Sequence, residues 1–281
     1  MIRKLGILNR TNLALCVAFA IAACNGGSIT EQIPHRERLG DVTEADWQKL
    51  SNKKIYFGHQ SVGFNIMDGI EDLQKENLRI KLNIVETNEL EKISQGIFAH
   101  SRIGRNGDPK SKIDDFATFI NQAGEDRLDY AGMKFCYVDM NADTDVKKLF
   151  SDYSTAMAKL KELHPKMTII HFTMPLMVNR ESWKTKIKKI FGKTEIWEYA
   201  ANTNRNRFNQ LIIEAYQGKE PLLDIAKIES TKPDGSRQAF DQNGVTYYSM
   251  APEYSYDNGH LNEIGRKRVA EQLLLLLINL K

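Results

Sequence analysis

Residues 54–63, KIYFGHQSVG, predict a short apolar strand followed by a turn that is bracketed by glycines. Its apolar start, residues 55–57, predicts a buried strand, and the turn that follows carries Ser61 between Gly58 and Gly63. From this unit to the C-terminus, mostly apolar segments of strand length alternate with segments of helical periodicity. The alternation predicts an α/β fold in which a central parallel sheet is covered by helices on both faces.

The expected elements follow from the spacing of apolar residues. An Asx/Thr cap with early acidic residues predicts a first helix that begins near Thr43. The expected strands are 55–57, 82–85, 134–139, 167–174 and 222–226, and the later expected helices are 65–77, 113–120, 146–163, 203–217 and 263–280. No internal repeat or low-complexity tract interrupts them.

A second informative stretch, residues 257–262 (DNGHLN), lies just before the last expected helix. Asp257 stands three residues before His260, where its carboxylate can accept a hydrogen bond from one imidazole nitrogen. Such a bond fixes the tautomer and leaves the other nitrogen free as a general base. Together with Ser61 near the other end of the chain, this pattern indicates hydrolytic acyl transfer.

The N-terminal 23 residues have the features of an export signal. Arg3, Lys4 and Arg10 precede an apolar run, residues 13–23, that is too short to span a membrane and ends in small residues. The run leads into Cys24 and resembles a bacterial lipobox, so we expect residues 1–23 to be a lipoprotein signal peptide and Cys24 to carry the lipid. An ordinary signal peptide is the alternative. The expected location is the cell envelope, with a lipid anchor in the periplasm or outer membrane.

The remaining chain is predicted to be one domain on a tether. The signal holds three of the 39 basic residues and no acidic residue, which leaves 36 basic against 36 acidic. This balance gives no support to a nucleic-acid partner. Residues 24–40 are polar and predict a flexible tether, and 41–281 predict a single domain. Cys136 lies in an apolar run and is expected to be a buried core residue.

The order of these motifs resembles that of the SGNH hydrolases, also called the GDSL esterase/lipase family. The resemblance covers residue 54 to the C-terminus and implies a flavodoxin-like three-layer α/β/α sandwich. It also implies that Ser61 is the nucleophile and that Asp257 and His260 complete a triad. The first block departs from the family pattern, because Gln60 stands where the family has Asp. Ser61 is also a suitable helix N-cap residue.

Two further blocks of the family supply oxyanion donors beside the amide of the nucleophile. The second block is similar to residues 105–108, which makes Gly107 the candidate and Gly104 its competitor. The third block is similar to residues 137–143, where Asn141 takes the place of the family's Asn. Asn at a strand end is also ordinary turn chemistry. The resemblance thus implies an oxyanion hole formed by Ser61, Gly107 and Asn141.

Other residues are candidates for the surroundings of the site. His59, Gln60 and Asp139 are expected to line the cleft, while His171 is expected in the core and Asp224 in a structural role. The lysine-rich segment 179–197 predicts an amphipathic surface helix, with a lid or a patch for anionic lipid or glycan as the alternative. No Cys/His cluster has zinc-ligand spacing, and neither a metal nor an organic cofactor is expected.

The function expected from these residues is that of a serine esterase. Its substrate would be an O-acetyl or short acyl ester on an envelope or imported carbohydrate or lipid. Two alternatives stay open. The altered first and third blocks are compatible with a non-catalytic binding lipoprotein on the same fold, and the same residues could transfer an acyl group to a sugar acceptor.

Overall fold

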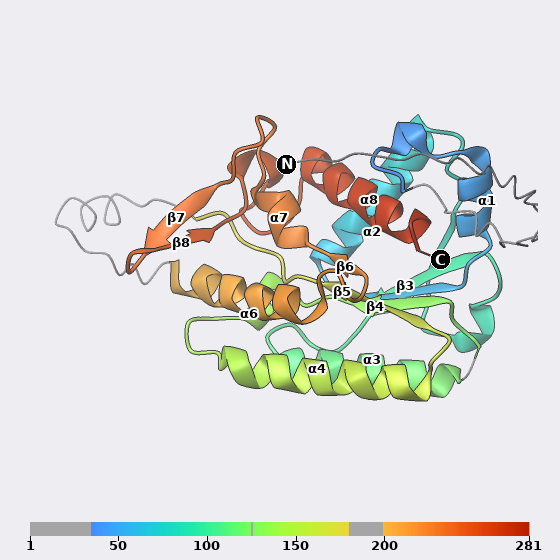
Figure 1. The fold of residues 1–281 in the computed structure, drawn as a ribbon, viewed down its shortest axis with the longest axis horizontal. Helices are drawn as coiled ribbons and strands as arrows, with labels where there is room; N and C mark the ends of the chain where they lie inside the picture. The colour runs from blue at the N-terminus through green and yellow to red at the C-terminus, as the bar shows by residue number, and fades with distance from the viewer. Residues whose placement is uncertain (1–34, 125, 180–198, 281) are drawn as a thin grey trace, which may run out of the picture. The chain divides into compact units, whose positions relative to one another are not determined.

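Six parallel strands form the central sheet of the computed structural model, in the order β2-β3-β1-β4-β5-β6 (Figure 1). The structure describes residues 35–124, 126–179 and 199–280. The strands are β1 (Ile55–His59), β2 (Asn83–Glu86), β3 (Ile97–Arg102), β4 (Tyr130–Met133), β5 (Thr168–Phe172) and β6 (Leu222–Leu223). Without the edge strand β2, the remaining five have the 2-1-3-4-5 order of flavodoxin-like folds. The predicted α/β class and its parallel sheet are therefore confirmed.

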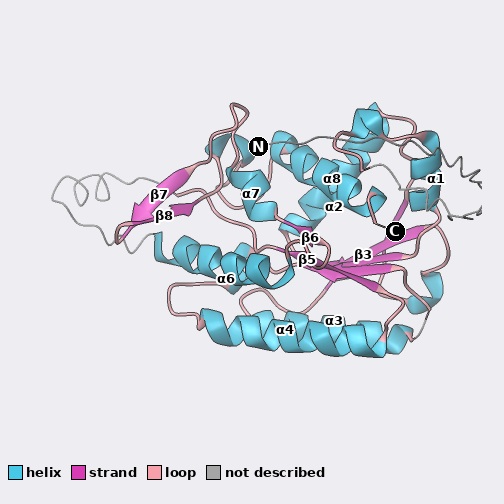
Figure 2. Ribbon diagram, viewed as in Figure 1, coloured by secondary structure: helices cyan, strands magenta, loops and turns pink. Residues whose placement is uncertain are grey.

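Helices cover both faces of this sheet, as Figures 1 and 2 show. One face carries α1 (Glu44–Ser51), α2 (Val62–Glu76), α7 (Ile225–Ser230) and α8 (Glu263–Ile278). The other face carries α3 (Pro109–Ala123), α4 (Val146–Leu163) and α6 (Ala200–Tyr216). Each face has its own apolar core, so the molecule has the three layers expected from the sequence.

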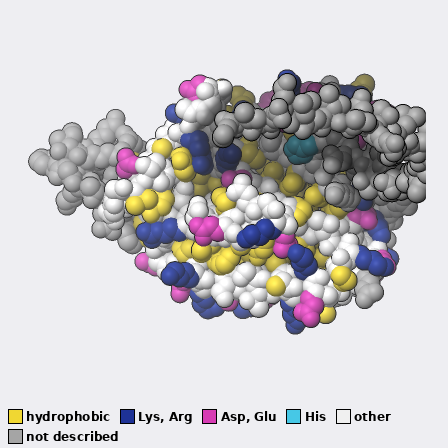
Figure 3. All heavy atoms as spheres, in the orientation of Figure 1, with side chains coloured by type: hydrophobic (Ala, Val, Ile, Leu, Met, Phe, Trp, Pro, Cys, Tyr) yellow, Lys and Arg dark blue, Asp and Glu magenta, His cyan; other side chains and the backbone are white. Residues whose placement is uncertain are grey.

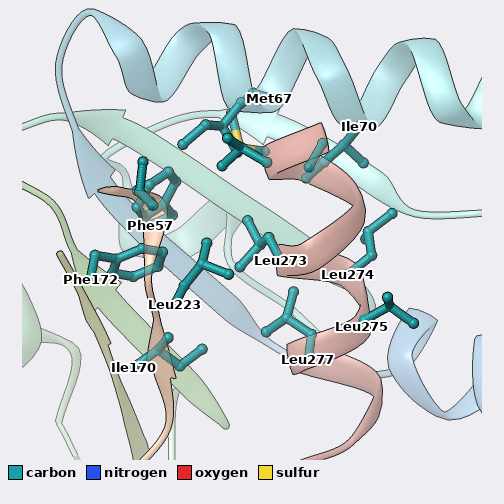
Figure 4. Close-up of a cluster of buried hydrophobic side chains, with 14 of the residues drawn as sticks. Phe57, Met67, Ile70, Ile170, Phe172, Leu223, Leu273, Leu274, Leu275 and Leu277 are labelled. Atoms are coloured by element: carbon teal, nitrogen blue, oxygen red, sulfur yellow. The ribbon is translucent and has the colours of Figure 1, made fainter. Parts of the chain in front are cut away.

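The leucine run of α8 fills the first of these cores. Leu273, Leu274 and Leu277 are buried and lie among side chains of β1, β5, β6 and α2 (Figure 4). Phe57 and Phe172 provide the sheet side of this core, with ring centroids 5.0 Å apart. The last helix of the chain is thereby packed between the first strand and the first long helix, α2.

Two strands differ from the sequence-based expectation. β4 occupies residues 130–133 rather than 134–139, because Tyr130 and its successors pair with both β1 and β5 in the sheet centre. The apolar run that predicted the later strand instead forms the connection to a short 3-10 helix, Tyr137–Asp139. β3 was not predicted at all, since its second half, His100 to Arg102, is polar. Its buried polar residues are satisfied by partners on β1: Tyr56 Oη lies 2.8 Å from Ser101 Oγ.

The other missing elements lie late in the chain. A hairpin of β7 (Ala239–Gln242) and β8 (Val245–Tyr248) turns at Asn243 and Gly244, both with positive φ. An Asn-Gly pair is the usual signal for such a turn and was overlooked. The expected strand 222–226 is wrong in its second half, because Asp224 accepts a hydrogen bond from the Lys227 amide and starts α7. The helix predicted at 146–163 is confirmed as α4.

The domain begins within the stretch expected to be a tether. Arg36 forms two backbone hydrogen bonds with the side chain of Asn279 and an ion pair with Asp46. The described residues from 35 onward accordingly belong to one compact unit. The predicted signal peptide and Cys24 lie outside the described residues, as does the lysine-rich segment beyond Asn179. Among the residues described, no helix is both long enough and apolar enough to cross a membrane.

Charges of both signs are interspersed on the face shown in Figure 3, over α4 and α6. Several are paired along α4 and α3, such as Lys148 with Asp152 at 2.7 Å and Lys110 with Asp114 at 2.7 Å. A surface of this kind has no single-sign field to attract a polyanion.

The contact between α2 and α8 gives a test of the fold. A Cβ added at Gly69 would lie 2.5 Å from the backbone oxygen of Arg266, and a backbone atom cannot move aside as a side-chain end can. Gly69→Ala should therefore lower the free energy of unfolding by about 1–3 kcal/mol in urea denaturation, despite the better helix propensity of alanine. Gly40→Ala, where nothing lies within 4 Å, is the matched control. Equal stability of the two variants would contradict this packing.

Candidate active site

Ser61 connects β1 to α2 in a backbone conformation that non-glycine residues rarely adopt. Its φ is 44° and its ψ is −104°, and its side chain makes no capping hydrogen bond to the helix. Such strain persists only where the surroundings enforce it, and it is common at functional sites. One enforcing contact is visible at Gly63, where an added Cβ would lie 2.2 Å from the His59 ring. Ser61 therefore occupies the expected N-cap position of α2, but its side chain does not cap the helix.

The Ser61 hydroxyl instead meets His260. Ser61 Oγ lies 2.5 Å from His260 Nε2, and His260 Nδ1 lies 2.6 Å from Asp257 Oδ2. The structure thus brings together three residues that the sequence separates by 199 positions at the widest. With Nδ1 protonated and donating to Asp257, Nε2 is left to accept the hydroxyl proton.

Asp257 is held as a carboxylate. Burial raises its pKa, but hydrogen bonds from the His260 amide and ring and from the Gly259 amide outweigh that effect and lower the pKa to about 2. The amide bonds to Oδ1 measure 2.7 Å from His260 and 2.9 Å from Gly259. Because Oδ1 of Asp257 accepts the two amide bonds and Oδ2 accepts the bond from the imidazole, Asp257 fixes the His260 ring relative to the backbone of its loop.

The histidine loop is also tied to the helix that carries the serine. Asn65, in the first turn of α2, accepts a hydrogen bond of 3.2 Å from the Leu261 amide. Ser255 Oγ donates to the His260 carbonyl at 2.7 Å and accepts from the Asn258 amide at 2.8 Å. The first bond holds the histidine loop against α2 and the other two hold the loop in shape, so together they fix the distance between the Ser61 hydroxyl and the His260 imidazole.

Two tyrosine rings flank the imidazole. Tyr137 meets His260 edge-on, with centroids 5.6 Å apart, and Tyr256 lies nearly parallel to it at 6.0 Å. Gly259 allows the first contact, because a Cβ there would lie 2.5 Å from the Tyr137 ring. Neither tyrosine was singled out from the sequence, although Tyr256 immediately precedes Asp257.

Asp139 does not line a cleft as expected. It is 3% exposed, and its Oδ2 accepts from Lys112 Nζ at 2.6 Å and from the Cys136 amide at 2.7 Å. Its Oδ1 accepts from the Gly107 amide at 2.9 Å. The Lys112–Asp139 ion pair is fully buried and joins α3 to the short 3-10 helix that follows β4, while the Gly107 bond adds the loop after β3.

The same bonds change the expected oxyanion hole. Because the Gly107 amide is bound to Asp139, it is not free to meet a substrate oxygen in this arrangement. Asn141 is exposed, and its Oδ1 accepts from the Asp143 amide and the Thr144 hydroxyl. Asn141 therefore forms an ordinary polar turn before α4, and within the described chain no hydrogen bond joins it to Ser61 or His260. The Ser61 amide at the start of α2 stays a candidate donor.

The remaining cleft candidates lie behind the turn. His59 is fully buried, and its Nε2 lies 2.9 Å from His100 Nδ1. Burial, and then the charge of buried Lys134, lowers the pKa of His59 well below its usual value, so the ring is neutral. Gln60 Nε2 donates to the carbonyls of Ile103 and Gly104 at 3.1 and 3.0 Å. Gln60 therefore ties the turn that carries Ser61 to the loop after β3.

A row of polar residues on α6 supports these loops and was missed from the sequence. Arg205 is buried and donates to the carbonyls of Tyr137 and Met140, at 2.8 and 3.1 Å. Asn209 bonds both backbone groups of Met174, and Asn202 bonds both of Met177. The available signal was the density of asparagine in this helix, since asparagine is a poor interior helix former.

No metal centre accompanies these residues: within the described ranges, no group of three or more His, Cys, Asp or Glu side chains could hold an ion. Cys136 is buried and free, in the turn that follows β4. The chemistry that the observed arrangement can perform is proton transfer from a serine hydroxyl to an oriented imidazole.

Comparison with known proteins gives likeness in structure only. No family model and no curated protein sequence matches the chain. A lipolytic protein of the G-D-S-L family from Desulfitobacterium hafniense is 8% identical over 80% of this chain and 99% of its own, with a TM-score of 0.48. A GDSL-like lipase from Bacteroides thetaiotaomicron is 12% identical over 80% and 87%, with a TM-score of 0.45. The periplasmic domain of a lipopolysaccharide acetyltransferase from Salmonella ser. Paratyphi A is 16% identical over 79% and 83%, also with a TM-score of 0.45.

The buried ion pair can be tested by substitution. Asp139→Asn keeps the shape of the side chain but leaves Lys112 buried without its counter-charge, so the free energy of unfolding should fall by about 3–5 kcal/mol in urea denaturation. Asp114→Asn, which breaks an exposed pair on the same helix as Lys112, should cost less than about 1 kcal/mol. An equally small loss in both variants would show that the buried Lys112–Asp139 ion pair does not stabilise the fold.

Proposed function

We propose that this protein is a serine ester hydrolase of the SGNH/GDSL type, with Ser61 as nucleophile, His260 as general base and Asp257 as its orienting carboxylate. The observation that carries the proposal is the hydrogen-bonded series from Ser61 Oγ through His260 to Asp257 Oδ2, with distances of 2.5 and 2.6 Å. The strained backbone of Ser61 supports it, because the side chain gives up the helix cap to reach the imidazole.

The reaction would proceed by two acyl transfers. Ser61 Oγ attacks the ester carbonyl while its proton passes to His260 Nε2. The imidazolium returns that proton to the leaving alcohol oxygen as the C–O bond breaks, which leaves an acyl-serine. Water then attacks the acyl carbon while one of its protons passes to His260 Nε2, and the imidazolium returns a proton to Ser61 Oγ as the bond between Oγ and the acyl carbon breaks and the carboxylic acid leaves. The Ser61 amide at the N-terminus of the 15-residue α2 is placed to donate to the oxyanion.

The proposed substrate is an O-acetyl or short acyl ester on a carbohydrate or lipid of the cell envelope. Acyl transfer to a sugar acceptor uses the same first step and differs only in what receives the acyl group from Ser61. A non-catalytic binding role is disfavoured by the strain stored at Ser61, which a binding module has no need to maintain.

Substitution of the three residues tests the chemistry. Ser61→Ala and His260→Ala should each lower kcat/KM for p-nitrophenyl acetate by at least about 10⁴-fold, and Asp257→Asn should be similarly impaired because the imidazole loses its orienting acceptor. Ser151→Ala, on the exposed surface of α4, is the control. Labelling by a fluorophosphonate should disappear in Ser61→Ala and persist in Ser151→Ala.

Full activity or unchanged labelling in Ser61→Ala would overturn the nucleophile assignment. Product analysis with and without a sugar acceptor separates the two acyl-transfer outcomes, since hydrolysis releases free acid in both conditions.

We further propose that the protein is exported and anchored through lipid on Cys24. The support is the basic start and short apolar run of residues 1–23. Cys24→Ala should move the protein from the membrane fraction to the soluble fraction on cell fractionation, and intact-mass measurement should show the loss of the lipid. Retention of Cys24→Ala in the membrane would contradict the anchor.

A further inference from the structure

Tyr256 is an exposed aromatic residue beside the proposed base. It is 68% exposed, and it is the one aromatic side chain among the large exposed apolar residues of the described ranges. Its ring is inclined by only 13° to that of His260. An aromatic face left open to solvent next to a reactive group is unusual, because such surface is normally buried unless a ligand covers it.

The backbone around Tyr256 is fixed. On one side, Ser255 forms an isolated bridge with Leu261 and hydrogen bonds to both His260 and Asn258. On the other side, Asp257 takes the amides of Gly259 and His260. The ring is therefore presented on a held segment, so that little conformational entropy is lost when a ligand packs against it.

The surroundings of the triad favour a ligand that lies on the surface. Two cavities formed by the described residues, of about 830 and 570 Å³, are lined by none of the three triad residues. A long acyl chain needs a concave apolar site that buries most of its surface. Among the large exposed apolar side chains of the described residues, Tyr256 contacts His260, and Val138 follows Tyr137, which contacts it as well.

The negative charge beside Tyr256 further limits the chemical class of ligand that can bind there. Asp257 adjoins the ring and carries a negative charge, so a phosphate-bearing headgroup or nucleotide would be repelled. A sugar ring has an apolar face of C–H groups that can stack on an aromatic ring, and hydroxyls at its edge that can meet Asn258 and water. Neutral carbohydrate fits both the flat apolar face and the acidic neighbour.

We propose that Tyr256 is the stacking platform for the sugar ring that carries the scissile ester, so that the substrate is an acylated glycan rather than an acyl lipid. This inference rests on the proposed function of Ser61 and His260. Stacking on Tyr256 would hold the sugar next to His260, which must return a proton to the sugar oxygen when the ester bond breaks.

Binding to an inactive protein tests the platform separately from catalysis. In a Ser61→Ala background, calorimetry with O-acetylated xylo-, cello- and chito-oligosaccharides should show binding of at least one of them. Tyr256→Ala should weaken that binding about 5- to 50-fold, in line with stacking contacts measured for other flat rings, and Tyr256→Trp should retain it. Leu78→Ala is the control, because Leu78 is 80% exposed and follows the opposite end of α2 from Ser61.

Kinetic measurements on the protein with Ser61 intact distinguish a loss of glycan binding from a displacement of the His260 ring. Tyr256→Ala should raise KM for the acetylated oligosaccharide and lower kcat/KM for it at least about fivefold more than kcat/KM for p-nitrophenyl acetate. Equal losses on both substrates, unchanged glycan binding, or a selective loss on a long-chain acyl ester would each overturn the platform. Failure of the proposed function is distinguishable, since it would appear as full activity of Ser61→Ala, whatever the binding data show.

Discussion

The close approach of α2 and α8 is the contact on which the site depends. Ser61 precedes the first helix and His260 precedes the second, so their side chains meet only if the two helix starts lie together. Because Gly69 has no side chain, α2 can approach the backbone of α8 closely at Arg266. The side chain of Arg266 also forms an ion pair with Asp72 on α2. Asn65 then adds a bond from the first turn of α2 to the residue after His260. Local sequence supplies the reactive groups, and helix packing supplies their distance.

Buried titratable side chains below the carboxyl edge of the sheet also hold the site in place, through the loops around it. Lys112, Lys134, Asp139 and Glu229 are all buried, and burial raises the pKa of Glu229 to about 8. Charged groups in an apolar core are costly, and an apolar replacement of similar shape is often as stable. Here Asp139 accepts the backbone amides of Gly107 and Cys136, and Glu229, which its raised pKa leaves mostly protonated near neutral pH, accepts the amide of Leu176; each of these amides lies in a loop that follows a strand. Their contribution is to the shape of the loops around the site.

The sequence predicted the class of fold and the Ser–Asp–His pattern because both rest on short-range signals. Apolar periodicity identifies α4, and a carboxylate three residues before a histidine can bond within its own loop. The bond of the Gly107 amide to Asp139 and the bonds of Asn141 Oδ1 to Asp143 and Thr144 were not predicted, since they depend on how the loops fold. β4 was displaced because a central parallel strand is set by its neighbours on both sides and not by its own apolar run. His59 and His100, which pair across two strands, could not be matched without the register between β1 and β3.

The two bonds between Arg36 and Asn279 have a consequence for how the domain faces its surroundings. Asn279 caps the far end of α8, and a 16-residue helix is about 24 Å long. The chain therefore enters the domain at the helix end remote from His260. An attachment at the start of the described residues would therefore lie about one length of α8, roughly 24 Å, from the histidine loop.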